Sequence, residues 1–94
     1  MNSLFFLYHM FTTYVLYSKE LEKFYIGSTS GDIGERLKKH LSNHKGFTAR
    51  AKDWELVYSE KFATKTEALR RERQLKSWKS NIRIKEFIAR SSSE

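Results

Sequence analysis

The chain has 94 residues, of which 39% are apolar and 15% aromatic, and this composition describes one small folded domain. It contains no cysteine, so a disulfide framework, a zinc knuckle and a thiol nucleophile are excluded. The formal net charge of +7 favours a polyanionic partner. The most apolar stretch, residues 4–17, is too short to span a membrane and lacks signal-peptide features, so we expect a cytoplasmic protein without a membrane segment.

The first part of the chain predicts a β-hairpin. Residues 11–18 and 23–29 are rich in Tyr, Phe, Thr, Val and Ile, and the polar residues 19–22 separate them. Residues 1–11 are expected to form an N-terminal extension to the domain.

A helix is predicted after the hairpin. Asp32 is suited to cap it and Glu35, three residues later, completes a capping box. The apolar residues of this segment repeat at helical spacing, namely Ile33, Leu37 and Leu41.

The second half predicts a third strand over residues 54–62. Leu56, Tyr58 and Phe62 share one face of that strand at period two, and Val57 lies on the other face. Three strands cannot enclose a core alone, so helices must cover the sheet.

Two more helices are predicted after this strand. Thr64 and Glu67 form a capping box for a helix that runs to about Trp78, and Ser80 caps a shorter helix over residues 81–89. Residues 90–94 are expected to be a disordered tail. The order β-β-α-β-α-α predicts an α+β fold with a three-stranded antiparallel sheet flanked by helices.

The positive charge falls into two segments. Residues 36–52 hold six Lys or Arg and no acid, and residues 65–94 hold nine Lys or Arg against four acids. If the fold brings both segments together, they form a groove for phosphates.

Glu72 is misplaced on the second predicted helix. At 100° per residue it falls within the apolar stripe of Ala68, Leu69, Leu75 and Trp78. A carboxylate there costs several kcal/mol unless a cation compensates it. The alternatives are a metal ion, a structural ion pair with a residue such as Arg36, and a rotation that lets Glu72 reach solvent.

Arg36 and His40 lie one turn apart at the border of the first helix's apolar stripe. A guanidinium there can hold a phosphate through two hydrogen bonds. The alternative is a solvated helix flank. His40, His44 and a third ligand such as His9 also admit a zinc site, a weaker interpretation.

The predicted hairpin carries three of the five tyrosines, Tyr14, Tyr17 and Tyr25. On these residues alone, ordinary pairing of aromatic residues across strands is the favoured explanation. Gly27 near a strand end indicates a close approach of a helix or a ligand to the backbone.

These features together resemble the GIY-YIG nuclease family over residues 12–88. Tyr25-Ile26-Gly27 is the family's second signature, and Thr12-Thr13-Tyr14 stands in place of the first and keeps its tyrosine. Ten residues separate the two triplets, which is the family's spacing. The family's remaining elements follow in order on predicted helices: Arg36, His40 and Glu72.

The resemblance implies a single GIY-YIG nuclease domain over residues 12–89 that hydrolyses phosphodiester bonds of DNA with one divalent ion, Mg²⁺ or Mn²⁺. Glu72 would bind the metal and Arg36 the scissile phosphate. The general base stays open between Tyr25 and His40, with Tyr14 hydrogen-bonded nearby. The expected nucleic-acid contacts are Gly27, Lys38, Lys39, Lys45, Arg50, Arg70, Arg73, Lys76, Lys79 and Asn81.

With the catalytic module alone, the chain resembles a stand-alone bacterial type of the family that is linked to DNA repair and recombination. A structure-specific endonuclease is therefore expected. It is expected to be a monomer or a weak homodimer. RNA stays open as a substrate. The alternative is a non-catalytic DNA- or RNA-binding module that retains the fold, and a protein-interaction role is a third possibility.

Overall fold

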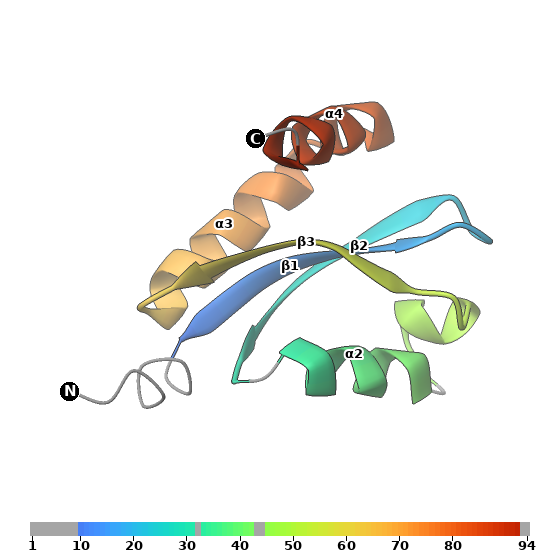
Figure 1. The fold of residues 1–94 in the computed structure, drawn as a ribbon, viewed down its shortest axis with the longest axis horizontal. Helices are drawn as coiled ribbons and strands as arrows, with labels where there is room; N and C mark the ends of the chain where they lie inside the picture. The colour runs from blue at the N-terminus through green and yellow to red at the C-terminus, as the bar shows by residue number, and fades with distance from the viewer. Residues whose placement is uncertain (1–9, 32, 43–44, 93–94) are drawn as a thin grey trace.

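The computed structural model describes residues 10–31, 33–42 and 45–92. Within them the fold is α+β, with one three-stranded antiparallel sheet in the order β2-β1-β3 and helices on both of its faces (Figure 1). The predicted fold class is therefore confirmed. The elements in chain order are β1 (Phe11–Ser18), β2 (Lys23–Ser30), α2 (Ile33–Ser42), the 3₁₀ helix η1 (Phe47–Arg50), β3 (Glu55–Phe62), α3 (Lys65–Ser77) and α4 (Asn81–Ser92).

The central strand β1 is buried on both faces. Its residues from Thr12 to Leu16 are all buried, which explains why this segment is continuously apolar or small rather than alternating. On one face, Tyr14 and Leu16 pack with Ala51 and Trp54 beneath α2 and η1. On the other face, a second core forms beneath α3 and α4 from Val15, Ile26, Leu75 and Ile84.

The strand β3 carries a β-bulge against β1. Val15 pairs with Tyr58 and Leu16 pairs with Leu56, so Val57 is an extra residue on β3. Val57 and Tyr58 both pack against the core under α3 and α4. The prediction that Val57 and Tyr58 lie on opposite faces is therefore wrong, because the bulge interrupts the period of two.

The helix boundaries follow from capping. The backbone N–H of Glu67 donates to the Thr64 hydroxyl at 3.2 Å, and the Thr64 hydroxyl donates to the Glu67 carboxylate at 2.8 Å, as predicted for α3. The backbone N–H of Arg83 donates to the predicted cap Ser80 at 3.3 Å. The helix α4 continues to Ser92, so residues 90–92 of the expected disordered tail are helical. The predicted cap Asp32 lies outside the described residues.

Candidate active site

A buried chain of hydrogen bonds links β1, α2 and η1. The Tyr14 hydroxyl lies 2.8 Å from His40 Nε2, and His40 Nδ1 lies 3.0 Å from the Thr48 hydroxyl. All three side chains are at most 5% exposed. His40 is thus a partnered, buried residue and not a solvated helix flank. Both of its ring nitrogens are engaged in these hydrogen bonds. The other predicted zinc ligands, His9 and His44, lie outside the described residues, so the zinc interpretation stays a prediction.

Thr48 was not among the predicted site residues. It lies in η1, a short 3₁₀ helix that follows Gly46, which has a φ of 83°. Its backbone carbonyl accepts a hydrogen bond from the Trp54 indole N–H at 2.9 Å, so the core tryptophan fixes the position of the threonine. No periodic pattern marks this segment, and only the tertiary structure brings Thr48 to His40.

Arg36 shares the Tyr14 hydroxyl with His40. Its Nε–H donates to Tyr14 Oη at 3.4 Å. Arg36 is half-buried and lies one helical turn before His40 on α2. Burial raises the pKa of Tyr14 above its usual value, and the hydrogen bond from Arg36 opposes this shift. Burial, with a smaller contribution from the Arg36 charge, lowers the pKa of His40. The cluster therefore holds a neutral phenol and a neutral imidazole beside one permanent cation.

Gly27 lies opposite Tyr14 in the β1–β2 register. A Cβ atom at this position would come within 2.6 Å of Tyr14 Oη and 2.8 Å of Tyr14 Cζ. The predicted close approach to the Gly27 backbone is thus made by the Tyr14 ring, and the expectation of a helix or a ligand there is corrected. Glycine is needed because any side chain would displace this ring from His40.

The tyrosines divide between the two faces of the sheet. The Tyr25 ring packs edge-on against His40, with ring centroids 4.8 Å apart, and stacks on Phe47 at 6.1 Å. Tyr17 instead pairs with Phe24 at 4.8 Å, which is ordinary cross-strand packing. The structure thus places Tyr14 and Tyr25, but not Tyr17, beside His40.

Glu72 lies on the other face of the sheet, on α3. Its side chain is 17% exposed, and its two carboxylate oxygens accept hydrogen bonds from the Ser28 hydroxyl at 2.5 Å and from the Lys76 ammonium at 2.6 Å. The cation that compensates this carboxylate is therefore Lys76 of the next turn, and not Arg36. Ser28 was missed by the sequence reasoning, although it follows the Tyr25-Ile26-Gly27 triplet directly and points to the face opposite Gly27.

Both halves of the site meet at β2, which is an edge strand. Tyr25 faces α2, and Ser28, three residues further along the strand, faces α3. The charge of Glu72 is one of the smaller contributions that raise the pKa of Tyr14, so the carboxylate acts on the phenol across this edge. A groove of about 320 Å³ lies along the edge, and its lining includes Tyr25, Phe47 and Lys76.

Three of the predicted nucleic-acid contacts line this groove, namely Lys76, Lys79 and Asn81. The Asn81 amide donates to the Glu22 carbonyl at 3.1 Å, and this hydrogen bond connects the start of α4 to the hairpin turn. Asn81 therefore has a structural partner at the groove. The remaining predicted contacts do not line it and are exposed on α2, on η1 and its approach, and on α3: Lys38, Lys39, Lys45, Arg50, Arg70 and Arg73.

The donor set fits a magnesium or manganese ion with one protein carboxylate. No three His, Asp or Glu side chains gather into a metal cluster among the described residues. Magnesium commonly takes one or two carboxylates and completes its shell with water and phosphate oxygens. Glu72 is held by Ser28 and already faces a cation, the Lys76 ammonium, so this carboxylate is suited to a positive ligand.

An α+β domain with tyrosines, an arginine, a histidine and a glutamate at one sheet edge also agrees with the comparison with known families. The model of the GIY-YIG catalytic domain matches residues 10–85. The chain therefore belongs to the GIY-YIG family, and this membership implies a nuclease that acts on DNA. Neither the curated proteins nor the solved structures contain a match to the chain. In the part of the chain that the structure describes, no helix is long and apolar enough to cross a membrane.

Proposed function

We propose that this chain is a metal-dependent endonuclease that hydrolyses DNA phosphodiester bonds at the β2 edge of the sheet, next to the groove that Tyr25 lines. The observation that carries the proposal is the shared Tyr14 hydroxyl, which joins Arg36 and His40 in one cluster at the strand edge where Glu72 approaches from the opposite face. Phosphoryl transfer requires positioned groups and charge stabilisation rather than covalent chemistry, and this cluster supplies both.

Arg36 has the role of holding the scissile phosphate. Its guanidinium is half-buried, and Tyr14 fixes Nε, so the terminal nitrogens keep their donors for two phosphate oxygens. Charge that develops on the phosphate in the transition state then meets a preorganised cation.

Tyr25 is the better placed of the two candidate bases. It lines the groove, whereas His40 is 5% exposed and bonded through both nitrogens. Because Tyr25 packs against the His40 ring and Tyr14 bonds to it, His40 acts in this proposal as the group that orients both tyrosines.

Glu72 and Ser28 would hold the divalent ion, with Lys76 giving up its place at the carboxylate. A bound ion of this kind acidifies water and polarises a phosphoryl oxygen. Lys76 and Lys79 then remain in the groove as phosphate contacts.

A DNA-cleavage assay with Mg²⁺ or Mn²⁺, on plasmid and on branched DNA, tests this function. Glu72→Gln is expected to reduce the cleavage rate by at least about a hundredfold, because it removes the carboxylate charge that would hold the ion. Glu86→Gln, an exposed glutamate on α4, is the matched control and should stay within about twofold. Equal cleavage by the Glu72 variant would overturn its assignment. Preferential cutting of branched over linear DNA is the result expected for a repair or recombination nuclease.

The second candidate function is a DNA- or RNA-binding module without catalysis. The Glu72–Lys76 ion pair favours it, because Lys76 satisfies a carboxylate oxygen that a catalytic ion requires. Thr13 is one of the two threonines that replace the family's first signature. Its hydroxyl donates to the Ala68 carbonyl at 2.6 Å and fixes α3 on the sheet, a structural role that is the same for both functions. Binding that persists in chelator, with no cleavage under any divalent metal, would establish this alternative.

A further inference from the structure

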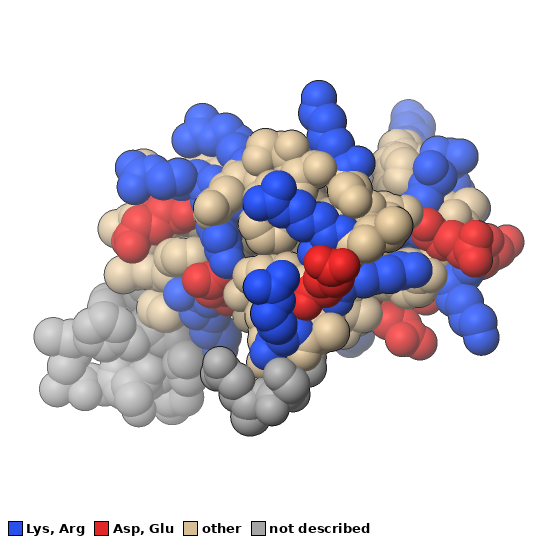
Figure 2. All heavy atoms as spheres, turned by 90° about the horizontal axis from the view of Figure 1, so that it is seen from above, with Lys and Arg blue, Asp and Glu red and all other residues tan. Residues whose placement is uncertain are grey.

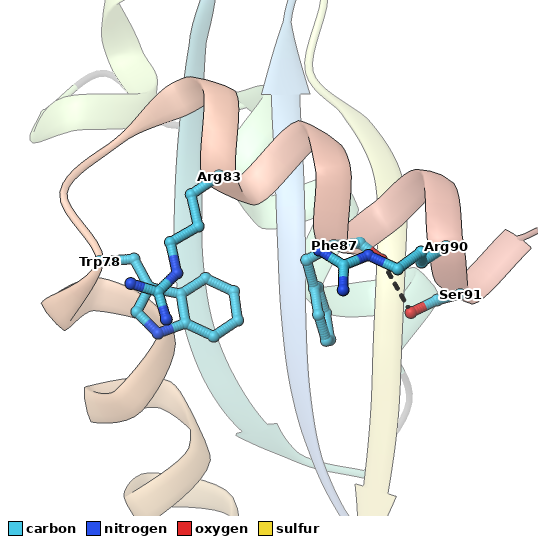
Figure 3. A pocket seen from close by; sticks show the side chains of 5 residues that line it. All are labelled: Trp78, Arg83, Phe87, Arg90 and Ser91. Carbon is cyan, nitrogen blue, oxygen red and sulfur yellow. Dashed lines mark hydrogen bonds between the residues drawn. The ribbon is translucent and has the colours of Figure 1, made fainter.

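A second pocket lies where α4 packs beside the end of α3. It has a volume of about 380 Å³ and is lined by Trp78, Arg83, Phe87, Arg90 and Ser91 (Figure 3). Arg83, Phe87 and Arg90 follow one another at four and three residues, which places them on one face of α4. Phe87, Arg90 and Ser91 lie beyond the residues matched by the family, so membership does not account for these three lining residues.

The pocket combines aromatic faces with arranged guanidinium groups. The Arg83 guanidinium lies 4.6 Å from the centroid of the Trp78 ring, and Figure 3 shows its side chain lying across the indole. The Trp78 and Phe87 rings pack edge to face at 5.3 Å. Stacking on a ring restricts the Arg83 side chain, so its N–H edge is presented to a ligand with less loss of side-chain entropy. Figure 3 also shows Arg90 reaching back along α4 toward Phe87.

The charge around the pocket selects a polyanion. The helices α3 and α4 together carry eight Lys or Arg and three Glu, and Lys79 lies between them. Figure 2, seen from the side of these helices, shows Lys and Arg side chains spread across this face. No Asp or Glu lines the pocket itself. Alternation of arginine with aromatic rings is the chemistry that binds single-stranded nucleic acid, whose phosphates and unstacked bases are both available.

The pocket adjoins the candidate active site through the connection between α3 and α4. Trp78 lines the pocket, while the next two residues, Lys79 and Ser80, line the groove beside β2. A strand that leaves the groove over this connection therefore reaches Trp78 directly.

We propose that this pocket holds one nucleotide of a single-stranded segment that flanks the cleavage site. Its neighbouring phosphates lie against Arg83 and Arg90. Its base lies beside the Trp78 and Phe87 rings, each of which also carries a guanidinium group, that of Arg83 on Trp78 and that of Arg71 on Phe87. The flanking position rests on the proposed nuclease function, whereas binding in the pocket is measurable without cleavage.

The test measures binding of a labelled twelve-nucleotide oligothymidylate to the full chain in EDTA by fluorescence anisotropy. The double variant Arg83→Gln/Arg90→Gln is expected to bind about tenfold more weakly, with the slope of log K against log salt reduced by about 1.4 for two lost phosphate contacts. Lys61→Gln/Lys65→Gln removes two exposed charges that line neither pocket and should change affinity by less than about twofold. An equal loss in the control pair would overturn the proposal, because net charge alone would then explain binding.

Tryptophan fluorescence locates the bound strand without a variant at the rings. Trp54 is 2% exposed, so iodide quenches mainly the half-buried Trp78. Saturating oligothymidylate is expected to protect Trp78 from iodide, and unchanged quenching would overturn the proposal. Equal protection by polyglutamate of the same charge would assign the pocket to acidic peptides instead. The binding test in EDTA does not depend on metal-dependent cleavage. A negative binding result therefore does not affect the nuclease assignment, and a negative cleavage assay does not affect the binding result.

Discussion

The Tyr14 hydroxyl has three neighbours. It is hydrogen-bonded to Arg36 and His40 and lies over the Gly27 backbone, and the Tyr14 residue is 1% exposed. Burial keeps the phenol protonated by raising its pKa and keeps the imidazole neutral by lowering the pKa of His40. Arg36 is thus the charged member of the Tyr14, His40 and Arg36 cluster near neutral pH, and in the proposed function it would meet the phosphate with two neutral partners behind it.

The buried His40 imidazole makes the free energy of unfolding depend on pH. Its folded-state pKa lies below the ordinary value of 6.5, so protonation favours the unfolded chain. The free energy of unfolding is therefore expected to be full above about pH 6.5 and to fall as the pH drops below it. Chemical denaturation between pH 5 and 7.5 measures this.

The control for this effect is His40→Gln, which removes the titrating group. The variant should be less stable at pH 7 and should show a shallower pH dependence between pH 5 and 6.5. Asp53, whose pKa is lowered mainly by the Ser18 hydroxyl, titrates below 3.8 and does not contribute in this window. An unchanged slope in the variant would assign the pH dependence to another group.

Lys76 predicts how Glu72 responds to metal. Its ammonium lies 2.6 Å from the carboxylate, so it competes with a divalent ion for the same oxygen. Lys76→Met is expected to tighten Mn²⁺ binding to the DNA-free protein by about three- to tenfold, since the removed ion pair is partly exposed and weakly stabilising. Electron paramagnetic resonance of free Mn²⁺ measures the affinity directly.

Lys79→Met is the matched control, because Lys79 lines the same groove without contacting Glu72 in any hydrogen bond or ion pair given for the described residues. Its Mn²⁺ affinity should remain that of the unaltered chain. If both variants bind Mn²⁺ alike, Lys76 does not occupy the metal position and the arrangement of ligands proposed for Glu72 is wrong.

At the scale of elements, the edge strand β2 serves both halves of the site. Pleating sends Tyr25 and Gly27 toward α2 and Ser28 toward α3. Within four residues, β2 therefore provides a phenol, the backbone that the Tyr14 ring contacts, and a hydrogen-bond donor to Glu72. Because β1 pairs with β2 in a fixed register, Tyr14 lies across from Gly27. A change of register by one residue would send each side chain to the other face.

Gly27→Ala tests this coupling between β1 and β2. The added Cβ meets the phenol and ring of Tyr14 at under 3 Å, so the ring must move away from His40. We expect the free energy of unfolding to fall by about 1–3 kcal/mol and cleavage to fall with it. Ser30→Ala, on an exposed position of the same strand, is the control and should change stability by less than about 0.5 kcal/mol. Full activity in the glycine variant would show that the Tyr14–His40 contact is dispensable.

At the scale of the whole molecule, the two basic segments lie on opposite faces of the sheet. One belongs to α2 and η1, and the other to α3 and α4, which cover the two sides of the sheet (Figure 1). Neither segment alone surrounds the groove. We expect a duplex bound across the edge of the sheet to contact both, so that a net charge of +7 acts at one site.

Salt dependence tests whether both segments contact the same DNA. Lys38→Gln/Lys39→Gln on α2 and Arg70→Gln/Arg73→Gln on α3 are each expected to reduce the slope of log K against log salt by up to about 1.8 on duplex DNA. Anisotropy with a labelled duplex in EDTA, over a range of salt concentrations, measures the slopes. If one pair leaves the slope unchanged, the DNA lies on one face of the sheet only, and the expectation that it contacts both basic segments is wrong.

Much of this architecture was predictable because local signals and the tertiary structure agree. The capping box at Thr64 is formed as the spacing indicated, and the strand and helix order is confirmed. The bulge at Val57 was not predictable, because two-residue periodicity carries no information on an extra residue whose cause is the pairing with β1. Nor was the helical state of residues 90–92, since a polar segment has no apolar repeat and is helical as a continuation of α4.

By itself the sequence determined the family, the order of the elements and which residue types are candidates for chemistry, because spacing along a helix or strand decides which side chains share a face. Only the tertiary structure decided their partners. It paired Glu72 with Ser28 and Lys76, bonded His40 to Thr48, and laid the Tyr14 ring across Gly27. These contacts join segments distant in the chain, and their geometry depends on sheet register and helix packing, which no local pattern specifies.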